Sequence, residues 1–286
     1  MKKGILIFAH NSPKLDYGLL SLISGKLAKQ NLKVPVSLAT DEQTINWLKE
    51  SNRYELACEI FDQIITVESP ESGNVRKLFD GKSSEVVPFK NFNRTDAWDI
   101  TPYDRTLMID SDYLIFTDVL GSYWDIDQDI MIGNNVSTLY DERSIGYHDK
   151  YVSDTGVHMF WATAVMFTKN QNTKIFFDLL KSVRDKYRIY GDLYRFDSRQ
   201  YRNDISFSVA SHIFNGFNTP DVNLPAILTF SDRDVLYKIN DSNSLVFMVS
   251  NDMLEGNYVL TSVNGIDIHV MNKQSIVRNA DRLLEL

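Results

Sequence analysis

Short apolar runs alternate with longer helical patterns in the N-terminal third of the chain. Residues 5–9, 34–39 and 63–67 are apolar runs of strand length, and residues 15–30 show a helical pattern. Alternation of this kind predicts a parallel sheet covered by helices. Residues 40–43 read Thr-Asp-Glu-Gln, which is typical of a capping box, so we expect the next helix to begin there.

The pattern is less regular towards the C-terminus, where residues 157–167 are rich in aromatic side chains. The expected later elements are two helices near 173–187 and 203–214, two strands near 246–249 and 266–271, and a closing helix over 274–286. Between the two parts, residues 68–91 hold prolines and glycines among polar residues. This composition indicates a loop-rich insertion and a candidate mobile lid.

Two carboxylates, Asp110 and Asp112, interrupt the apolar strand pattern of residues 107–115. At spacing i, i+2 on an extended segment they point the same way, and ionised carboxylates are costly to bury without a cation. We therefore expect them at the sheet edge, holding a divalent cation, with a simple strand-end turn as the alternative. Mg²⁺ and Mn²⁺ take carboxylate oxygens and keep positions for water and substrate phosphates, which suits a nucleotide diphosphate.

The other closely spaced aspartates lie in polar, turn-like stretches, where solvated side chains are expected. These pairs are Asp125 with Asp127, Asp127 with Asp129, and Asp232 with Asp234.

Composition narrows the classes of function. The chain has 286 residues, 43% of them hydrophobic, and a formal net charge of -8, which disfavours broad nucleic-acid binding and anionic membrane surfaces. The apolar run at 5–9 is too short for a membrane span, so it is interpreted as a first strand. Cys58 is the single cysteine; it excludes a disulfide framework, fits a cytoplasmic location and is expected to be a small core residue.

Residues 94–115 carry a more specific signal. They contain a basic residue, a tryptophan, an Ile-Thr pair, a tyrosine and then the Asp-x-Asp strand. This segment resembles the core of the glycogenin-like glycosyltransferases, which have the GT-A fold and transfer sugars from nucleotide diphosphates with retention. The resemblance implies that Arg94 reaches the donor sugar-diphosphate. A guanidinium also suits a phosphate chemically, and the alternative is a surface charge or an ion pair with Asp96.

A second match to this family lies near the C-terminus. Residues 267–273 read Asp-Ile-His-Val-Met-Asn-Lys and resemble the start of the family pattern H-F-x-G-x-x-K-P-W, which implies that His269 is the third metal ligand. Lys273 would then neutralise the leaving diphosphate, although it comes earlier than the family's lysine and no Gly or Pro-Trp follows. The alternative for His269 is a half-buried strand histidine bonded to a backbone carbonyl.

Two further family landmarks depart from the pattern. The F-N-S-G-V loop corresponds to residues 161–165, Trp-Ala-Thr-Ala-Val, which lack the amide. The D-Q segment beneath the reacting sugar corresponds to the region of Asp204. Asp204 is therefore the candidate for positioning substrate or stabilising an oxocarbenium-like centre, with helix capping as the alternative.

Ligands of open α/β sheets bind at the carboxyl ends of the strands, so His10, Thr40 and Asp110 should line one rim. In this fold class the loop after the first strand holds the nucleobase. Asn11 would then bond the base and Tyr17 would stack on it, unless this loop is only a helix-entry turn. The other expected donor-binding residues are His10, Asp41 at the ribose (or as a first-turn helix acid) and Ser111.

Together these features predict an α/β, GT-A-like single domain over residues 1–286, with a mostly parallel central sheet flanked by helices. Residues from 1 to about 125 would form a Rossmann-like half that binds the nucleotide sugar, and residues from about 126 to 286 would form an acceptor-binding half and a C-terminal closing segment. The expected activity is metal-dependent glycosyl transfer, assisted by Mn²⁺ or Mg²⁺, from a UDP-sugar donor. The acceptor is left open among a glycan, a protein, a small molecule and a modified nucleic-acid base.

Two alternatives to this activity stay open. A sugar nucleotidyltransferase shares the α/β core, but it usually needs a glycine-rich basic segment after the first strand, and residues 10–18 do not supply one. A GT-A-like binding module without catalysis is the other alternative.

Overall fold

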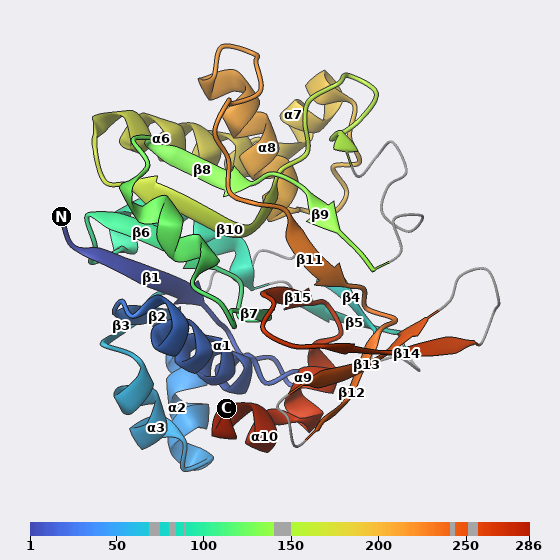
Figure 1. The fold of residues 1–286 in the computed structure, drawn as a ribbon. Helices are drawn as coiled ribbons and strands as arrows, with labels where there is room; N and C mark the ends of the chain where they lie inside the picture. The colour runs from blue at the N-terminus through green and yellow to red at the C-terminus, as the bar shows by residue number, and fades with distance from the viewer. Residues whose placement is uncertain (69–74, 80–83, 89, 140–149, 241–243, 251–256) are drawn as a thin grey trace.

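The central sheet of the computed structural model has six strands (Figure 1). The structure describes residues 1–68, 75–79, 84–88, 90–139, 150–240, 244–250 and 257–286. The first four strands of the sheet are parallel to one another, and the fifth is antiparallel to both of its neighbours. In spatial order they are β3 (Gln63–Thr66), β2 (Val36–Thr40), β1 (Lys3–Phe8), β6 (Arg105–Ile109), β10 (Trp161–Thr168) and β8 (Ile130–Gly133).

Both faces of this sheet are covered, and β1 shows why its sequence is a continuous apolar run. Ile5 and Ile7 belong to the hydrophobic core on one face, while Leu6 and Phe8 belong to the core on the other. A strand buried on both faces cannot alternate apolar with polar residues. The predicted α/β class, with a mostly parallel sheet flanked by helices, is thus confirmed.

Helices form the outer layers. One layer packs around α1, which contacts α3, α9 and α10, and the other pairs α6 with α8. The helices are α1 (Tyr17–Leu32), α2 (Glu42–Glu50), α3 (Tyr54–Ile60), α4 (Ala97–Ile100), α6 (Gln171–Asp185), α7 (Tyr187–Tyr194), α8 (Asn203–Phe214), α9 (Lys273–Arg278) and α10 (Ala280–Glu285), with 3-10 turns η1 (Asn91–Asp96) and η2 (Val119–Asp125).

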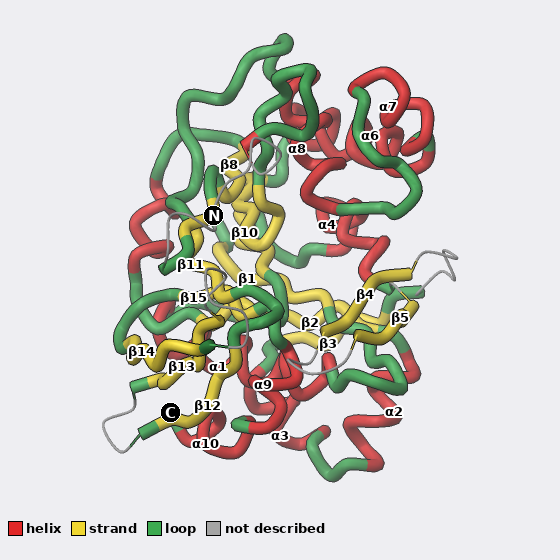
Figure 2. Tube along the Cα trace, turned by 90° about the vertical axis from the view of Figure 1, so that its right-hand side faces the viewer, coloured by secondary structure: helices red, strands yellow, loops and turns green. Residues whose placement is uncertain are grey.

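Three smaller sheets complete the described part of the chain, and Figure 2 shows the hairpin β4–β5 and the sheet β12–β13–β14 at opposite sides of its view. Their strands are, in spatial order, β7 (Tyr113–Leu114), β15 (Ile268–Val270), β11 (Ile227–Phe230) and β9 (Val136–Ser137); β12 (Val235–Ile239), β13 (Leu245–Ser250) and β14 (Tyr258–Val263); and β4 (Val75–Phe79) and β5 (Ser84–Pro88).

Several local expectations need correction. The helix after β2 is capped by Asp41, whose carboxylate accepts from Thr44 N at 2.8 Å, so the N-cap lies one residue after the expected Thr40 and the reciprocal hydrogen bond of a capping box is not formed by these residues. Cys58 is exposed and not in the core, because α3 buries Ala57 and Ile60 on its inner face. Residues 157–167 are more regular than expected, since most of them form β10.

The region 68–91 contains the hairpin β4–β5, which the sequence did not predict. Pro88 is the last residue of β5. A proline is tolerated at the end of an edge strand because its missing N–H group breaks no hydrogen bond in the middle of the sheet. Pro70, Gly73 and Gly81 lie outside the described residues, and so does much of the expected lid.

Of the other aspartate pairs, Asp125 is exposed as expected, but Asp234 is buried. The Asp234 carboxylate accepts hydrogen bonds from Ser231 N at 2.7 Å and Ser250 N at 3.0 Å, and so ties the start of β12 to the end of β13. A buried aspartate is tolerated when backbone N–H groups satisfy it, and composition alone did not reveal these donors.

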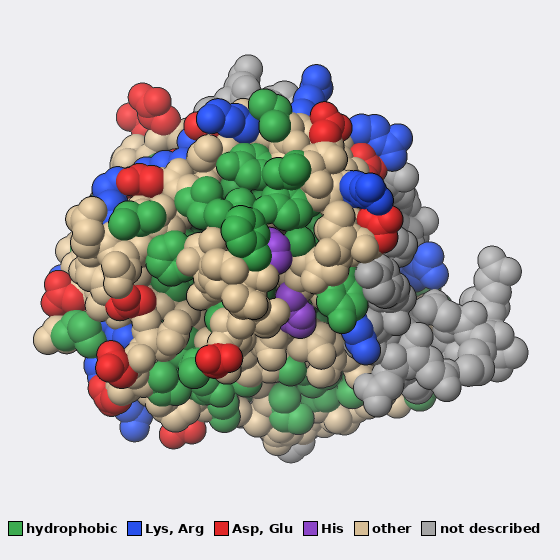
Figure 3. Space-filling model, turned by 90° about the horizontal axis from the view of Figure 1, so that it is seen from above, with side chains coloured by type: hydrophobic (Ala, Val, Ile, Leu, Met, Phe, Trp, Pro, Cys, Tyr) green, Lys and Arg blue, Asp and Glu red, His purple; other side chains and the backbone are tan. Residues whose placement is uncertain are grey.

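The face that carries α7 and α8 exposes hydrophobic side chains (Figure 3). The exposed apolar residues of this region include Ile189 and Leu193 of α7 and Phe217 after α8. Among the described residues, no helix combines the length and the apolar character needed to span a bilayer.

Candidate functional site

The two predicted metal aspartates lie in a turn between β6 and β7. The chain leaves the central sheet after Ile109, where Asp110 N donates to Thr163 O of β10 at 2.9 Å. Tyr113 N donates to Asp110 O at 3.1 Å and closes the turn. The single strand expected over 107–115 is therefore two strands in different sheets, because the turn redirects the chain at the aspartates.

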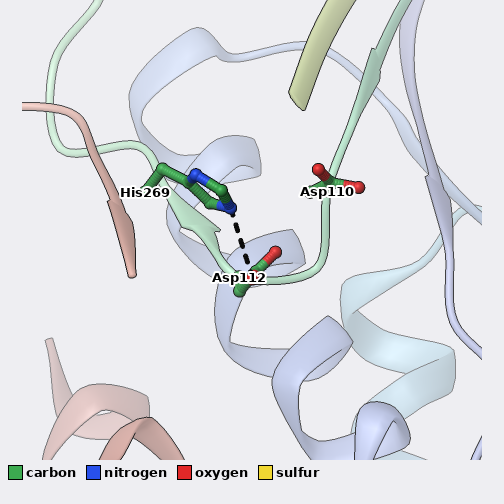
Figure 4. A group of neighbouring side chains, drawn as sticks. All are labelled: Asp110, Asp112 and His269. Carbon is green, nitrogen blue, oxygen red and sulfur yellow. Dashed lines mark ion pairs between the residues drawn. The ribbon is translucent and has the colours of Figure 1, made fainter. Parts of the chain in front are cut away.

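His269 reaches this turn through strand pairing. In the antiparallel pair of β15 and β7, His269 lies opposite Tyr113, and Val270 N donates to Asp112 O at 3.0 Å. His269 Nε2 lies 3.3 Å from Asp112 Oδ2, and ligand atoms of Asp110, Asp112 and His269 all lie within 4.8 Å of one another (Figure 4). The structure thus brings together the three residues proposed as metal ligands.

Asp267 fixes the position of the strand that carries the histidine. Its Oδ1 accepts from Phe116 N and Thr117 N, both at 2.8 Å, and its Oδ2 accepts from Thr117 Oγ1 at 2.9 Å. Three hydrogen bonds to one half-buried carboxylate clamp the start of β15 to the end of β7. Sequence reasoning noted Asp267 only as a letter of the motif.

Replacing Asp267 with alanine should lower the free energy of unfolding by about 3 kcal/mol, because two backbone N–H groups lose a charged acceptor. Urea denaturation measures this loss. Asp267→Asn keeps an acceptor oxygen at the same position and should lose less than half as much. A loss below about 1 kcal/mol in the alanine variant would contradict the clamp.

Arg94 is a buried counterion of Asp110, with 2% of its surface exposed. Its Nη1 donates to Asp110 Oδ1 at 2.6 Å and its Nη2 to Ala162 O at 2.5 Å. The alternative pairing with Asp96 is not observed, because Arg184 pairs with Asp96 instead, at 3.2 Å. Burial raises the pKa of Asp110 above its usual value, while the Arg94 charge acts in the opposite direction.

Lys273 is the counterion of Asp112. Its ammonium contacts Asp112 Oδ2, the oxygen that also faces His269, and both side chains are almost fully buried. Burial alone would raise the pKa of Asp112, but the Lys273 and His269 charges outweigh burial and hold this pKa below its usual range. Lys273 begins α9, where the Asn272 side chain accepts from Ser275 N at 3.2 Å and caps the helix.

Two carboxylates and an imidazole form a donor set that fits Mn²⁺ or Mg²⁺, with oxygen ligands preferred. His269 Nδ1 is buried and has no hydrogen-bond partner among the described residues. The other ring nitrogen, Nε2, faces Asp112 Oδ2 at 3.3 Å, and a metal could bind Nε2 only when that nitrogen carries no proton. The three side chains fit a divalent cation, provided that the His269 nitrogen facing the metal carries no proton.

These residues line one pocket of about 420 Å³. Predicted residues that line it are Tyr17, Arg94, Asp110, Ser111, Asp112, Asp204, His269 and Lys273. The lining also includes residues that sequence reasoning left without a role, namely Val75, Asn91, Thr163, Gln200, Arg202 and Met271. Three of them, Asn91, Arg202 and Met271, lie within three residues of Arg94, Asp204 or His269, and this proximity is their sequence signal.

Asp204 lies at the start of α8 but does not cap it. The N-cap is Arg202, whose side chain makes no capping hydrogen bond. Asp204 Oδ1 instead accepts from Ala162 N at 2.9 Å, so this carboxylate joins α8 to the start of β10 at the pocket wall. Ala162 is also the residue whose carbonyl accepts from Arg94, so one residue of β10 contacts both Asp204 and Arg94.

His10, Asn11 and Asp41 form a separate buried cluster at the carboxyl ends of β1 and β2, and none of them lines the pocket. Asn11 Oδ1 accepts from Gly18 N at 2.6 Å, so the amide oxygen holds the start of α1. His10 Nε2 lies 3.2 Å from Asn93 Oδ1, and its Nδ1 lies 3.7 Å from Asp41 Oδ2. Burial lowers the pKa of His10 below its usual value.

No protein-family model matches the chain, and no curated protein matches its sequence. Solved structures do match. The galactosyltransferase LgtC, in complex with donor and acceptor sugar analogues, is 19% identical over 72% of this chain and 70% of its own, with a TM-score of 0.49. Mouse xyloside xylosyltransferase 1 is 12% identical over 81% of this chain and 87% of its own, with a TM-score of 0.44.

The glycosyltransferase GlyE of Streptococcus pneumoniae is 14% identical over 77% of this chain and 44% of its own, with a TM-score of 0.40. Each of these three solved structures is a glycosyltransferase by name.

Proposed function

We propose that this protein is a glycosyltransferase that uses a nucleotide-diphosphate sugar, with a UDP-sugar as donor, and that Mn²⁺ or Mg²⁺ assists the transfer. One observation carries the proposal: Asp110, Asp112 and His269 converge with two buried cationic side chains on one pocket, just beyond the carboxyl end of a central parallel strand. Pockets at this edge of open α/β sheets bind nucleotides.

In this proposal the chain supplies positive charge where the leaving diphosphate gains negative charge. A divalent cation held by Asp110, Asp112 and His269 would act as a Lewis acid on the diphosphate oxygens. Arg94 is held rigidly by two hydrogen bonds, so its charge is preorganised at the pocket wall. Lys273 lines the same pocket and adds a second positive charge.

Asp204 is proposed to face the reacting sugar. Its Oδ1 is engaged by Ala162 N, whereas its Oδ2 lies 3.5 Å from the partly exposed Arg202 guanidinium. A carboxylate at this position stabilises positive charge that develops on the anomeric carbon as the carbon–oxygen bond to the diphosphate breaks. Because residues 94–115 resemble the retaining glycogenin-like enzymes, we propose that the transfer retains the configuration of the anomeric carbon.

Replacing Asp204 with asparagine should reduce turnover by about a hundredfold, while UDP and Mn²⁺ bind as in the wild type. The amide oxygen still accepts from Ala162 N, so the wall keeps its shape and only the charge is lost. Steady-state kinetics together with calorimetric UDP binding separates the two effects. Equal losses of turnover and of UDP affinity would show that Asp204 serves binding rather than the transition state.

The nucleoside end of the donor is proposed to lie along the loop after β1. Tyr17 and Ser111 line the pocket and would contact the donor directly. His10, Asn11 and Asp41 would shape this end from behind, since their side chains are buried in contacts with one another and with α1 and α2. Residues 1–125 would thus form most of the donor side, joined there by Asp204, His269 and Lys273, and the rest of residues 126–286 would form the acceptor side.

The activity is tested by donor hydrolysis without an acceptor. UDP-, GDP-, CDP- and dTDP-sugars are incubated with the protein and Mn²⁺, and release of free nucleotide is followed. We expect slow release from a UDP-sugar that stops on adding EDTA. Nucleotide binding without release from any donor would instead indicate a binding module.

A further inference from the structure

Lys273 and Arg94 neutralise the two aspartates in different ways. Arg94 makes two hydrogen bonds, one to Asp110 and one to the carbonyl of Ala162, so its guanidinium is anchored on both sides. Among the residues that the structure describes, Asp112 is the sole partner recorded for the Lys273 ammonium. The Arg94 charge is therefore fixed, whereas the Lys273 charge rests on one contact at the end of a flexible side chain.

That contact involves a proposed metal ligand. Lys273 binds Oδ2 of Asp112, the oxygen that faces His269 Nε2 at 3.3 Å. The ammonium therefore satisfies in this structure the charge that a divalent cation would satisfy. Because 3% of Asp112 and 5% of Lys273 are exposed, water solvates this pair poorly, and separating the two charges is costly unless another cation replaces the ammonium.

We propose that Lys273 is an exchangeable counterion, which holds Asp112 while the metal site is empty and moves to the donor diphosphate when the metal binds. The proposal rests on the proposed function. The Lys273 backbone is fixed at the first turn of capped helix α9, so only the side chain has to move. The side chain already lines the pocket, so the diphosphate lies within its reach.

Two consequences follow from this exchange. Metal alone must displace the ammonium from Asp112 and should bind weakly. Nucleotide supplies a new anionic partner for the displaced ammonium, so metal and nucleotide should strengthen each other's binding, by the same factor in both directions.

The test compares Mn²⁺ binding, by calorimetry, in the wild type and in Lys273→Met, with and without UDP. Methionine keeps an unbranched side chain that is one heavy atom shorter, and it removes the charge. We expect Lys273→Met to bind Mn²⁺ alone at least about tenfold more tightly than the wild type, and UDP to enhance Mn²⁺ binding much less in the variant. Lys174→Met is the matched control, because Lys174 pairs with Asp178 on the surface of α6 and should change neither value.

Unchanged or weaker Mn²⁺ binding by Lys273→Met would overturn the exchange while leaving the metal site itself standing. If the wild type binds Mn²⁺ neither alone nor with UDP, the proposed function fails and the exchange fails with it. If Lys273→Met folds poorly, thermal melting replaces calorimetry as the measurement. Mn²⁺ should then raise the Tm of Lys273→Met more than that of the wild type. A variant that stays unfolded with saturating Mn²⁺ would show that the lysine is a permanent structural charge.

Discussion

Replacing Asp112 with asparagine is expected to lower metal-dependent donor turnover by about a thousandfold. The substitution preserves the size of the side chain but removes the negative charge that His269 and Lys273 both face. A divalent cation would lose one of its two carboxylates. Steady-state kinetics at saturating Mn²⁺ measures the effect, and turnover within tenfold of the wild type would contradict the site.

The same substitution should also lower stability, a cost that the sequence did not indicate. It leaves the Lys273 ammonium buried without its carboxylate, and breaking one side of a buried pair costs about 3 kcal/mol. The double variant Asp112→Asn with Lys273→Met removes both charges and should recover most of this stability but none of the activity. Urea denaturation of the single and double variants separates lost folding from lost chemistry.

Replacing Arg94 with methionine should cost about 3 kcal/mol of unfolding free energy and at least a hundredfold in turnover. The buried Asp110 loses its counterion, and the Ala162 carbonyl at the pocket wall loses its hydrogen bond from Arg94. Arg94→Lys keeps the charge but cannot make both hydrogen bonds, so its unfolding free energy and turnover should lie between those of the wild type and those of the methionine variant. Equal stability of the methionine variant and the wild type would contradict the buried role of Arg94.

The pH dependence of the Arg94→Met variant has a definite sign. Burial already raises the pKa of Asp110, and loss of Arg94 should raise this pKa further. A group whose folded-state pKa lies above its unfolded value stabilises the fold when protonated, and this stability disappears as the pH rises through the folded pKa. The stability deficit of the variant should therefore grow from acidic to neutral pH.

The sequence pattern predicted those elements whose own burial determines their hydrophobic residues. The strand β1 and the helix α8 lie where the apolar pattern placed them, because β1 is buried on both faces and α8 packs against α6 and β10. The hairpin β4–β5 was missed because the prolines and glycines of the region 68–91 are typical of a loop. Its pairing depends on a partner strand that composition does not reveal.

The sequence predicted the two aspartates of the candidate site, but it did not predict the contacts of its two cationic side chains. Asp110 and Asp112 stand out because charge interrupts an apolar strand, and His269 emerged through a family pattern. The contacts of Arg94 with Ala162 and of Lys273 with Asp112 are tertiary, formed by β10 and α9, and no spacing in the sequence encodes them. The burial of Asn11 and Asp41 is likewise set by α1 and α2 packing.

The central claim is that a nucleotide diphosphate binds at Asp110, Asp112 and His269 with a divalent cation. The most direct test is a thermal-shift comparison of UDP, GDP, CDP and dTDP, with and without Mn²⁺, on the wild type and on the Asp112→Asn variant. Stabilisation of the wild type by UDP that needs Mn²⁺, and that is absent in the variant, is the predicted result. No shift with any nucleotide, or a shift that survives both EDTA and the substitution, would contradict the account.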